Sequence, residues 1–317
     1  MRRTRSCGAA AKLPPPHFFV SGGLHAGMEG YRKSMSILYI VSTPIGNLGD
    51  MSHRALEVLR GADRVLAEDT RRTGILLRHY GVDASLVSAH EHNEAGRAEQ
   101  VVGWLDAGET LALVSDAGTP LLSDPGSRIV RRVLDAGHEV VPVPGASALL
   151  AALAGSGLPV ETFTFFGFVP RTGRERDALL ERLAWLEHTA VVYESPEGLL
   201  RLLTDLAERC GGERPVVVAR ELTKLHETFV RGTLAEVVAY YDAVPRVKGE
   251  IVVVLGGAAA DEAPDMAAAA ALARSLLAGG ARPSEVAREL ARRTGLSRND
   301  AYSLALDQTS GREGDPE

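Results

Sequence analysis

The residues best placed to do chemistry lie in the segment Ser115–Gly126, where an apolar run ends in a carboxylate, a glycine and a proline. A second turn, Asp124-Pro125-Gly126, closes the same segment. Loops of this kind at strand ends are where open α/β sheets bind ligands, and closely spaced turns leave backbone N–H and C=O groups free to hold polar atoms. A similar loop, Val143–Ala148, follows one predicted helix and one predicted strand later. Together the two loops predict a site for a small polar molecule.

Two charged segments follow other predicted strands at the same sheet edge. Glu68–Thr73 combines two carboxylates with two guanidinium groups; alone, such a run is more often a solvated helix start with internal ion pairs. His90–Glu94 has two histidines one residue apart, without a third ligand at the spacing of a metal site. Because both segments lie at strand ends, a ligand role becomes about as well supported as a structural one for Glu68–Thr73. For His90–Glu94, contact with a polar substrate is favoured over a metal.

The remaining strand-end motifs are ambiguous when taken singly. Thr43–Asp50 is similar to a dinucleotide fingerprint but lacks its G-x-G-x-x-G spacing, and no phosphate-binding lysine follows. A tight turn, with Asp50 or Ser52 capping the next helix, explains this motif as well as a ligand does. Tyr193–Pro196 and Arg220–Lys224 also follow predicted strands. Neither a Ser/His/Asp nucleophile elbow nor a reactive cysteine context is present.

The elements that must position these residues alternate regularly from residue 37 onward. Strands separated by helical segments predict βαβ units and a mostly parallel sheet. We expect strands at 37–43, 64–67, 86–88, 111–115 and 139–143, and helices at 52–59, 73–80, 95–106, 127–136 and 146–154.

A second unit opens with the aromatic run 163–168 and breaks this rhythm. The run 229–231 follows the strand 216–220 too soon for a helical crossover, so that pair is predicted to be antiparallel and the sheet mixed. The other expected elements are strands at 190–193 and 250–255 and helices at 174–186, 198–209 and 234–241.

Length and composition set the outer limits. A chain of 317 residues is expected to hold two or three domains. The formal net charge of −6 argues against a free-standing grip on naked nucleic acid. Cys7 and Cys210 are too few and too distant for a disulfide framework or a zinc site, which fits a reducing cytosol. No segment has the roughly 18 apolar residues of a membrane span.

The expected domains are 35–157, a first α/β domain; 158–257, a second α/β domain; and 267–310, a small helical domain. Residues 1–34 are interpreted as a disordered extension or as translation from an upstream start, with Met35 beginning the fold. The helical domain is expected to have helices at 267–277, 284–293 and 299–306. It is interpreted first as a helical cap and second as a helix-turn-helix reader. Five arginines there favour an RNA-facing surface: Arg282, Arg288, Arg292, Arg293 and Arg298.

Taken together, the strand-end motifs resemble the tetrapyrrole methylase superfamily of S-adenosylmethionine-dependent transferases, over residues 36 to about 307. Within it they are most similar to the branch that methylates small-subunit ribosomal RNA. The segments that carry the resemblance are Thr43–Asp50, Ala67–Thr73, His90–Glu94, Ser115–Gly126, Pro144–Ala148, Tyr193–Pro196, Ala219–Lys224 and Lys248–Glu250.

The resemblance implies a two-domain tetrapyrrole-methylase-like α/β fold with a mostly parallel and a mixed sheet, a homodimer, and a cytoplasmic location. It also implies methyl transfer from S-adenosyl-L-methionine to the ribose 2′-hydroxyl of a cytidine in the decoding region of small-subunit (16S) ribosomal RNA. The assembled small ribosomal subunit is the expected partner; DNA and membranes are not. Two alternatives stay open: methylation of a tetrapyrrole precursor, and a non-catalytic ribosome-assembly factor that only binds the cofactor.

Site residues follow from the same resemblance. The positions implied for the cofactor are Leu48, Asp116, Ala117, Gly118, Thr119, Leu122, Ser147, Ala148, Glu194 and Leu222; no metal is implied. A ribose hydroxyl must lose its proton, and Glu68 is the first candidate for the base, with Lys224 second. Arg71 and Asn93 are expected to orient the ribose and its phosphate. Gly46–Asp50 departs from the Gly-x-Gly-Pro-Gly-Asp of porphyrin-modifying relatives, which favours the RNA branch.

Overall fold

The computed structural model describes residues 36–258, 266–294, 296 and 298–310. The predicted N-terminal extension, the proposed start at Met35 and residues 259–265, which lie between the second and third expected domains, are outside these residues. No helix in the described part of the chain has the length and apolarity needed to cross a membrane.

The first sheet is parallel throughout, in the order β3-β2-β4-β1-β5. The carboxyl ends of parallel strands meet at one edge, so the loops after β1, β2 and β4 gather there. The strands are β1 (Ile37–Val41), β2 (Arg64–Ala67), β3 (Leu86–Ser88), β4 (Leu111–Val114) and β5 (Glu139–Val143).

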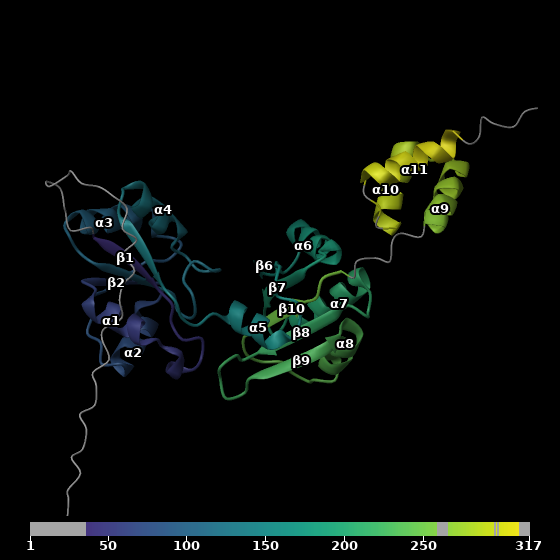
Figure 1. The fold of residues 1–317 in the computed structure, drawn as a ribbon. Helices are drawn as coiled ribbons and strands as arrows, with labels where there is room; N and C mark the ends of the chain where they lie inside the picture. The colour runs from purple at the N-terminus through teal and green to yellow at the C-terminus, as the bar shows by residue number, and fades with distance from the viewer. Residues whose placement is uncertain (1–35, 259–265, 295, 297, 311–317) are drawn as a thin grey trace, which may run out of the picture. The chain divides into compact units, whose positions relative to one another are not determined.

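Helices cover both faces of this sheet (Figure 1). Alternate apolar side chains of each strand point to opposite faces, which divides the core into two layers. One layer packs α1 (His53–Gly61) and α2 (Thr70–His79) against Val65 and Val114. The other packs α3 (Glu94–Asp106) and α4 (Ser127–Asp135) against Leu66 and Leu113. The predicted parallel α/β unit is therefore present.

The second sheet is mixed, in the order β6-β7-β10-β8-β9. β6 pairs in parallel with β7, whereas every other pair is antiparallel, including the predicted β8–β9 pair. The strands are β6 (Phe163–Phe168), β7 (Thr189–Glu194), β8 (Pro215–Arg220), β9 (Thr228–Thr233) and β10 (Ile251–Leu255).

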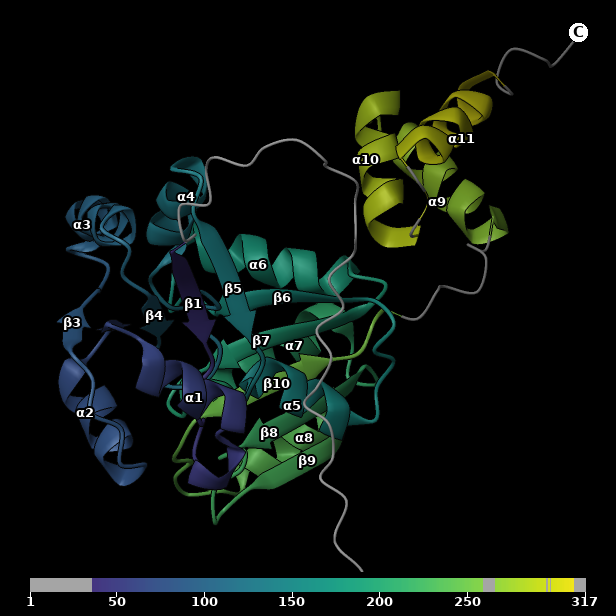
Figure 2. The same ribbon diagram turned by 60° about the vertical axis from the view of Figure 1, so that its left-hand side comes forward.

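The second sheet also has helices on both faces (Figure 2). Along β8, Val216 and Val218 contact the layer formed by α6 (Arg174–Trp185), α7 (Leu199–Cys210) and α8 (Leu234–Asp242). The alternate residues Val217 and Ala219 face α5 (Ala148–Ser156). This alternation fixes the register, because a slip of one residue would exchange the two faces.

Two helices begin two or more residues away from the start that the periodicity predicts, and side-chain caps explain both. α2 begins at Thr70 rather than residue 73, because the Asp69 carboxylate accepts a hydrogen bond from the Arg71 N–H. α5 begins at Ala148 rather than residue 146, because the Ser147 side chain accepts a bond from the Leu150 N–H. For α1, Ser52 is the cap and Asp50 is not.

The C-terminal helices are α9 (Met266–Ala278), α10 (Pro283–Thr294) and α11 (Arg298–Ser310). They share a small apolar core of alanine, valine and leucine side chains, among them Ala273, Leu290 and Ala305. Three helices are present where the sequence predicts them. The domain boundaries drawn from the sequence stay a prediction.

Candidate active site

A cavity of about 480 Å³ gathers the strand-end loops. This volume lies in the range of pockets for small organic ligands. The residues that line it are Ile45, Glu68, Arg72, Asp116–Thr119, Leu122–Asp124, Ser147, Ala148, Phe168, Tyr193–Pro196, Leu222 and Gly249–Val252. Both sheets thus contribute walls to one cavity.

Most residues predicted for the cofactor line this cavity. They are Asp116, Ala117, Gly118, Thr119, Leu122, Ser147, Ala148, Glu194 and Leu222, joined by Glu68 from the predicted catalytic set. Leu48, Arg71, Asn93 and Lys224 are not among the lining residues.

Hydrogen bonds hold three of the loops to one another. Thr43 and Gly118 form an isolated β-bridge, with N–H to O distances of 2.9 and 3.0 Å. The Thr119 hydroxyl donates to the carbonyl oxygen of Ala146 at 3.1 Å and lies 3.1 Å from the Ser42 hydroxyl. The loops that follow β1, β4 and β5 are therefore fixed relative to one another by their own polar groups.

The second half of the central loop has an unusual backbone. Leu121 and Ser123 adopt φ values of 76° and 70°, and Gly126 adopts 127°. A Cβ atom at Gly126 would lie 2.7 Å from a Leu121 methyl and 2.8 Å from a Leu113 methyl, so only glycine fits. Left-handed conformations at non-glycine residues are costly and persist where the surroundings hold them in place.

Glu94 fixes the end of this segment at Gly126. Its carboxylate is buried, and Oε1 accepts hydrogen bonds from the N–H groups of Gly126 (3.1 Å), Arg128 (2.6 Å) and Ile129 (3.4 Å). α4 has no side-chain cap of its own, so a residue of α3 satisfies its N-terminal donors. For the segment His90–Glu94 the sequence favoured polar substrate contact over a metal, and that contact stays a prediction. The buried member of the segment, Glu94, anchors Gly126 and the first turn of α4.

Three carboxylates share the wall of the cavity formed by the first sheet. Asp116 accepts a bond from the Asp69 N–H at 3.0 Å and pairs with the Arg72 guanidinium at 3.2 Å. Burial raises the pKa of Glu68, and the charge of Asp116 adds to this effect. Burial, followed by the charge of Glu68, raises the pKa of Asp124 to about 6.

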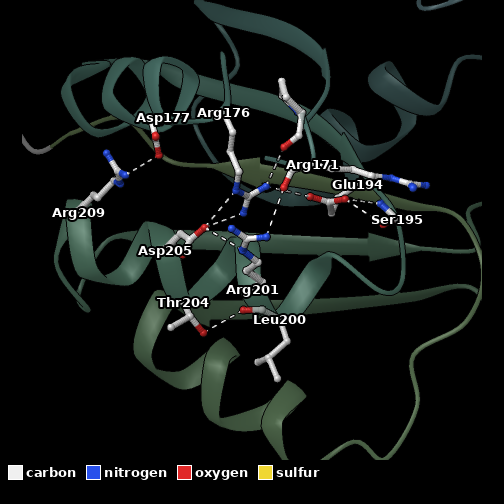
Figure 3. A network of polar contacts seen from close by, with 11 residues as sticks. Arg171, Arg176, Asp177, Glu194, Ser195, Leu200, Arg201, Thr204, Asp205 and Arg209 are labelled. Carbon is white, nitrogen blue, oxygen red and sulfur yellow. Dashed lines mark hydrogen bonds and ion pairs between the residues drawn. The ribbon is translucent and has the colours of Figure 1, made fainter. Parts of the chain in front are cut away.

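On the opposite wall, Glu194 is held from behind by a buried network (Figure 3). Its Oε1 accepts bonds from the N–H and the hydroxyl of Ser195 at 2.7 and 3.1 Å. Its Oε2 lies 4.0 Å from Nη1 of Arg176, whose side chain is only 4% exposed. Nη2 and Nε of Arg176 in turn bond Oδ2 of Asp205, at 2.7 and 3.2 Å.

The four predicted residues outside the lining have other partners. Leu48 is exposed on the short helix Leu48–Asp50, and its carbonyl oxygen accepts a bond from the Tyr80 hydroxyl. The Arg71 side chain is 88% exposed and pairs with Asp69.

Asn93 is engaged within its own turn, where its Oδ1 accepts a bond from the His90 N–H at 2.9 Å. Its amide nitrogen contacts Ser88 and the His90 ring. A direct contact between Asn93 and a ribose therefore has no support in the geometry.

Lys224 donates from Nζ to Glu221 at 2.8 Å and to Glu250 at 3.1 Å. These bonds outweigh partial burial and leave the pKa of Lys224 raised, so its ammonium group keeps its proton. Of the two candidate bases, Glu68 is the one that lines the cavity; the role of either as the base stays a prediction.

Several lining residues were not among the site residues predicted individually: Arg72, Asp124, Phe168 and Tyr193. All but Phe168 lie in strand-end motifs that the sequence analysis singled out. Asp124 had a usable signal, since it belongs to the second Asp-Pro-Gly turn. No sequence signal distinguished Arg72 from Arg71, because the two arginines are neighbours in α2 and differ only in the direction in which the helix points their side chains. Phe168 and Tyr193 form an edge-to-face pair with ring centres 5.3 Å apart. In a sequence, aromatic residues of this kind usually indicate core packing and not a site.

No group of three or more His, Cys, Asp or Glu side chains in the described ranges is arranged to hold a metal ion. The family model for Tetrapyrrole (Corrin/Porphyrin) Methylases matches residues 37–238 of this chain.

Two relatives named "Ribosomal RNA small subunit methyltransferase I" are similar to this chain over most of its length. The protein from Synechocystis sp. is 47% identical over 276 residues, which cover 86% of this chain and 98% of that protein. The protein from Escherichia coli O157:H7 is 42% identical over 277 residues, which cover 87% of this chain and 96% of that protein.

A solved structure of diphthine synthase shares the fold, with a TM-score of 0.53 and 16% sequence identity. The matched region covers 70% of this chain and 90% of the diphthine synthase chain. With two relatives above 40% identity across nearly their whole length, the chain belongs to the tetrapyrrole methylase family and, within it, to the group named ribosomal RNA small subunit methyltransferase I.

Proposed function

We propose that this protein transfers a methyl group from S-adenosyl-L-methionine to the 2′-hydroxyl of a cytidine ribose in the decoding region of small-subunit (16S) ribosomal RNA. Membership of the family supports methyl transfer to ribosomal RNA. The alternative substrates considered from the sequence, a tetrapyrrole precursor or none at all, are not favoured by these relatives.

The observation that carries the choice of methyl donor is the charge of the cavity. Five carboxylates line it against a single guanidinium, that of Arg72; the carboxylates are Glu68, Asp116, Asp124, Glu194 and Glu250. Such a lining repels a triphosphate or another polyanion and attracts a cation. S-adenosylmethionine supplies a methyl group bonded to a positively charged sulfonium, so its charge suits this cavity.

The residues that we propose to hold the donor come from both sheets. The backbone of Asp116–Thr119 and the start of α5 at Ser147 and Ala148 offer polar groups along one wall. Leu222 and Glu194 offer an apolar and an acidic contact on the other. Alignment of donor and acceptor supplies much of the rate of an in-line displacement, so a cavity with fixed loops suits this reaction.

The attacking hydroxyl must also lose a proton, and we propose that Glu68 takes part in accepting it. Glu68 lines the cavity, and burial raises the pKa of its carboxyl group above its ordinary value. A base works best when its pKa lies near the working pH. Arg72, rather than its neighbour Arg71, is placed inside the cavity, and we propose the exposed Arg71 for contact with an RNA phosphate.

The substrate is proposed to be the assembled small subunit rather than free RNA. The net charge of −6 disfavours tight binding to a bare RNA backbone. Exposed arginines on the C-terminal helices, such as Arg293, are proposed to meet the particle. From the family resemblance we also propose a homodimer and a cytoplasmic location.

The test supplies methyl-labelled S-adenosylmethionine with three acceptors in parallel: undermethylated small subunits, free 16S ribosomal RNA and a porphyrin precursor. We expect label on the subunits, and 2′-O-methylcytidine in the nucleosides recovered from them by mass spectrometry. Label on the porphyrin alone would support the tetrapyrrole alternative. Cofactor binding without label on any acceptor would support the assembly factor.

A further inference from the structure

Asp124 occupies a position that the proposed function has not yet used. It lines the same cavity as Glu68 and Asp116 and lies between Ser123, with φ of 70°, and the Pro125-Gly126 turn. The buried carboxylate of Glu94 anchors the end of this loop through the Gly126 N–H and anchors the adjoining first turn of α4 through the N–H groups of Arg128 and Ile129. Strained backbone that is firmly anchored is characteristic of residues placed for function.

The carboxyl groups of Asp124 and Glu68 are electrostatically coupled. The negative charge of Glu68 raises the pKa of Asp124, after the larger effect of burial, whereas a hydrogen bond from Ser115 lowers it and Asp116 raises it slightly. Burial raises the pKa of the Tyr193 hydroxyl on the other wall, and the charge of Asp124 makes a smaller contribution in the same direction. Around Glu68, Asp116 and Asp69 raise its pKa while Arg72 and His90 lower it.

Asp116 differs from the other two carboxylates in this wall. It already accepts a backbone N–H bond from Asp69 and pairs with the Arg72 guanidinium. Its two carboxylate oxygens are therefore already engaged by groups of the protein. Asp124 and Glu68 are the carboxylates of this wall whose proton affinity is raised.

We propose that Asp124 is a further catalytic residue, which forms with Glu68 a pair of carboxyl groups that takes up the proton of the attacking hydroxyl. This inference rests on the proposed function and adds a second residue to its chemistry. As the ribose oxygen forms its bond to the methyl carbon, the carbon–sulfur bond breaks and its electron pair stays on sulfur. The O–H proton passes to a carboxylate of the pair, which becomes a carboxylic acid and later releases the proton to water.

The kinetic test compares wild type, Asp124→Asn, Glu68→Gln and the double variant on undermethylated small subunits across pH. We expect each single substitution to lower kcat by about 10²-fold and the double variant to lose little more, because residues that act as a unit are not additive. The KM for the cofactor should change far less than kcat. In Glu68→Gln the acid limb of the profile should move to lower pH, since Asp124 loses a negatively charged neighbour that raises its pKa.

A second measurement does not depend on turnover. In wild type labelled with ¹³C at the aspartate carboxyl groups, the Asp124 signal should titrate with a midpoint of about 6. In Glu68→Gln that midpoint should fall. The signal is assigned by its loss in Asp124→Asn or, if that variant does not fold, in Asp124→Glu.

The matched control is Glu99→Gln, which removes an exposed carboxylate of α3 that pairs with Arg132 outside the cavity. Its pH profile should match wild type. Two results would overturn the carboxyl pair without contradicting the proposed methyl transfer. One is a kcat for Asp124→Asn within twofold of wild type, and the other is an Asp124 titration midpoint that is the same in Glu68→Gln as in wild type. Absence of transfer by wild type would instead contradict the proposed function, and the titration would still report whether the pair is coupled.

Discussion

Replacing Glu94 with glutamine should weaken both the fold and the cavity, because one carboxylate oxygen serves three backbone donors. Oε1 of Glu94 accepts from Gly126, Arg128 and Ile129 at 3.1, 2.6 and 3.4 Å. Glutamine keeps an acceptor of the same shape but removes the negative charge at the N-terminus of α4. It also brings an amide NH₂ group into a buried position.

The magnitude follows from these two losses. A charge at a partly buried helix N-terminus contributes up to about 2 kcal/mol, and an unsatisfied buried polar group costs about 1–3 kcal/mol. We therefore expect the free energy of unfolding to fall by about 2–4 kcal/mol. For a folded unit of roughly 150–250 residues, this loss of stability corresponds to a fall in Tm of roughly 5–10 °C.

Thermal unfolding followed by circular dichroism measures the global effect, and hydrogen exchange of the amides of Gly126, Arg128 and Ile129 measures the local one. Exchange at these amides should accelerate, and cofactor affinity should fall because the loop through Asp124 loses its anchor. Glu99→Gln, on the same helix, should change the free energy of unfolding by less than about 0.5 kcal/mol, because its ion pair with Arg132 is exposed. Equal stability of the two variants, with unchanged exchange, would refute the anchoring role of Glu94.

Three further predictions concern the walls of the cavity. Asp124→Asn should stabilise the fold, because the raised pKa of Asp124, about 6, means that folding penalises its ionisation. The increase in the free energy of unfolding, of order 2 kcal/mol, should be largest above pH 6 and should vanish below about pH 4, where the carboxyl group is protonated in both states. Urea unfolding at the two extremes checks this, and a gain at low pH alone would contradict it. Gly198→Ala should displace Glu194, whose Oε1 would lie 2.5 Å from the new Cβ; calorimetry should show weaker cofactor binding, and unchanged affinity would argue against Glu194 as a contact. Arg72→Ala should raise the pKa of Glu68 by removing a cation, so the acid limb of activity should move to higher pH, whereas a shift to lower pH would reverse the sign of this coupling.

The architecture was largely predictable because alternation of apolar strands and helices is a local signal. The bounds expected for β2, β3 and β5 agree with the structure, since each of these strands is short and followed by a turn. The errors at the starts of α2 and α5 arose because Asp69 and Ser147 cap these helices. Each cap is a hydrogen bond from a backbone N–H to a side chain, and apolar periodicity does not predict it.

The site was predictable only at the level of loops. Parallel strands bring their carboxyl ends together, so the segments that line the cavity could be named from the sequence. Which side chain of a segment faces inward depends on tertiary packing. Arg72 rather than Arg71 enters the cavity, and in the turn before α3 the buried Glu94 holds a neighbouring loop while Asn93 serves its own turn.

The antiparallel bridge between Thr43 and Gly118 joins the loops that follow the parallel strands β1 and β4, beyond the sheet edge and beside the cavity. A wall made of paired backbone is preorganised, so little conformational entropy remains to be lost when a ligand binds. Affinity in such a site depends less on loop closure than on how well the ligand matches a shape that already exists. Substitutions that loosen the bridge should therefore weaken binding even when every residue that contacts the ligand is retained.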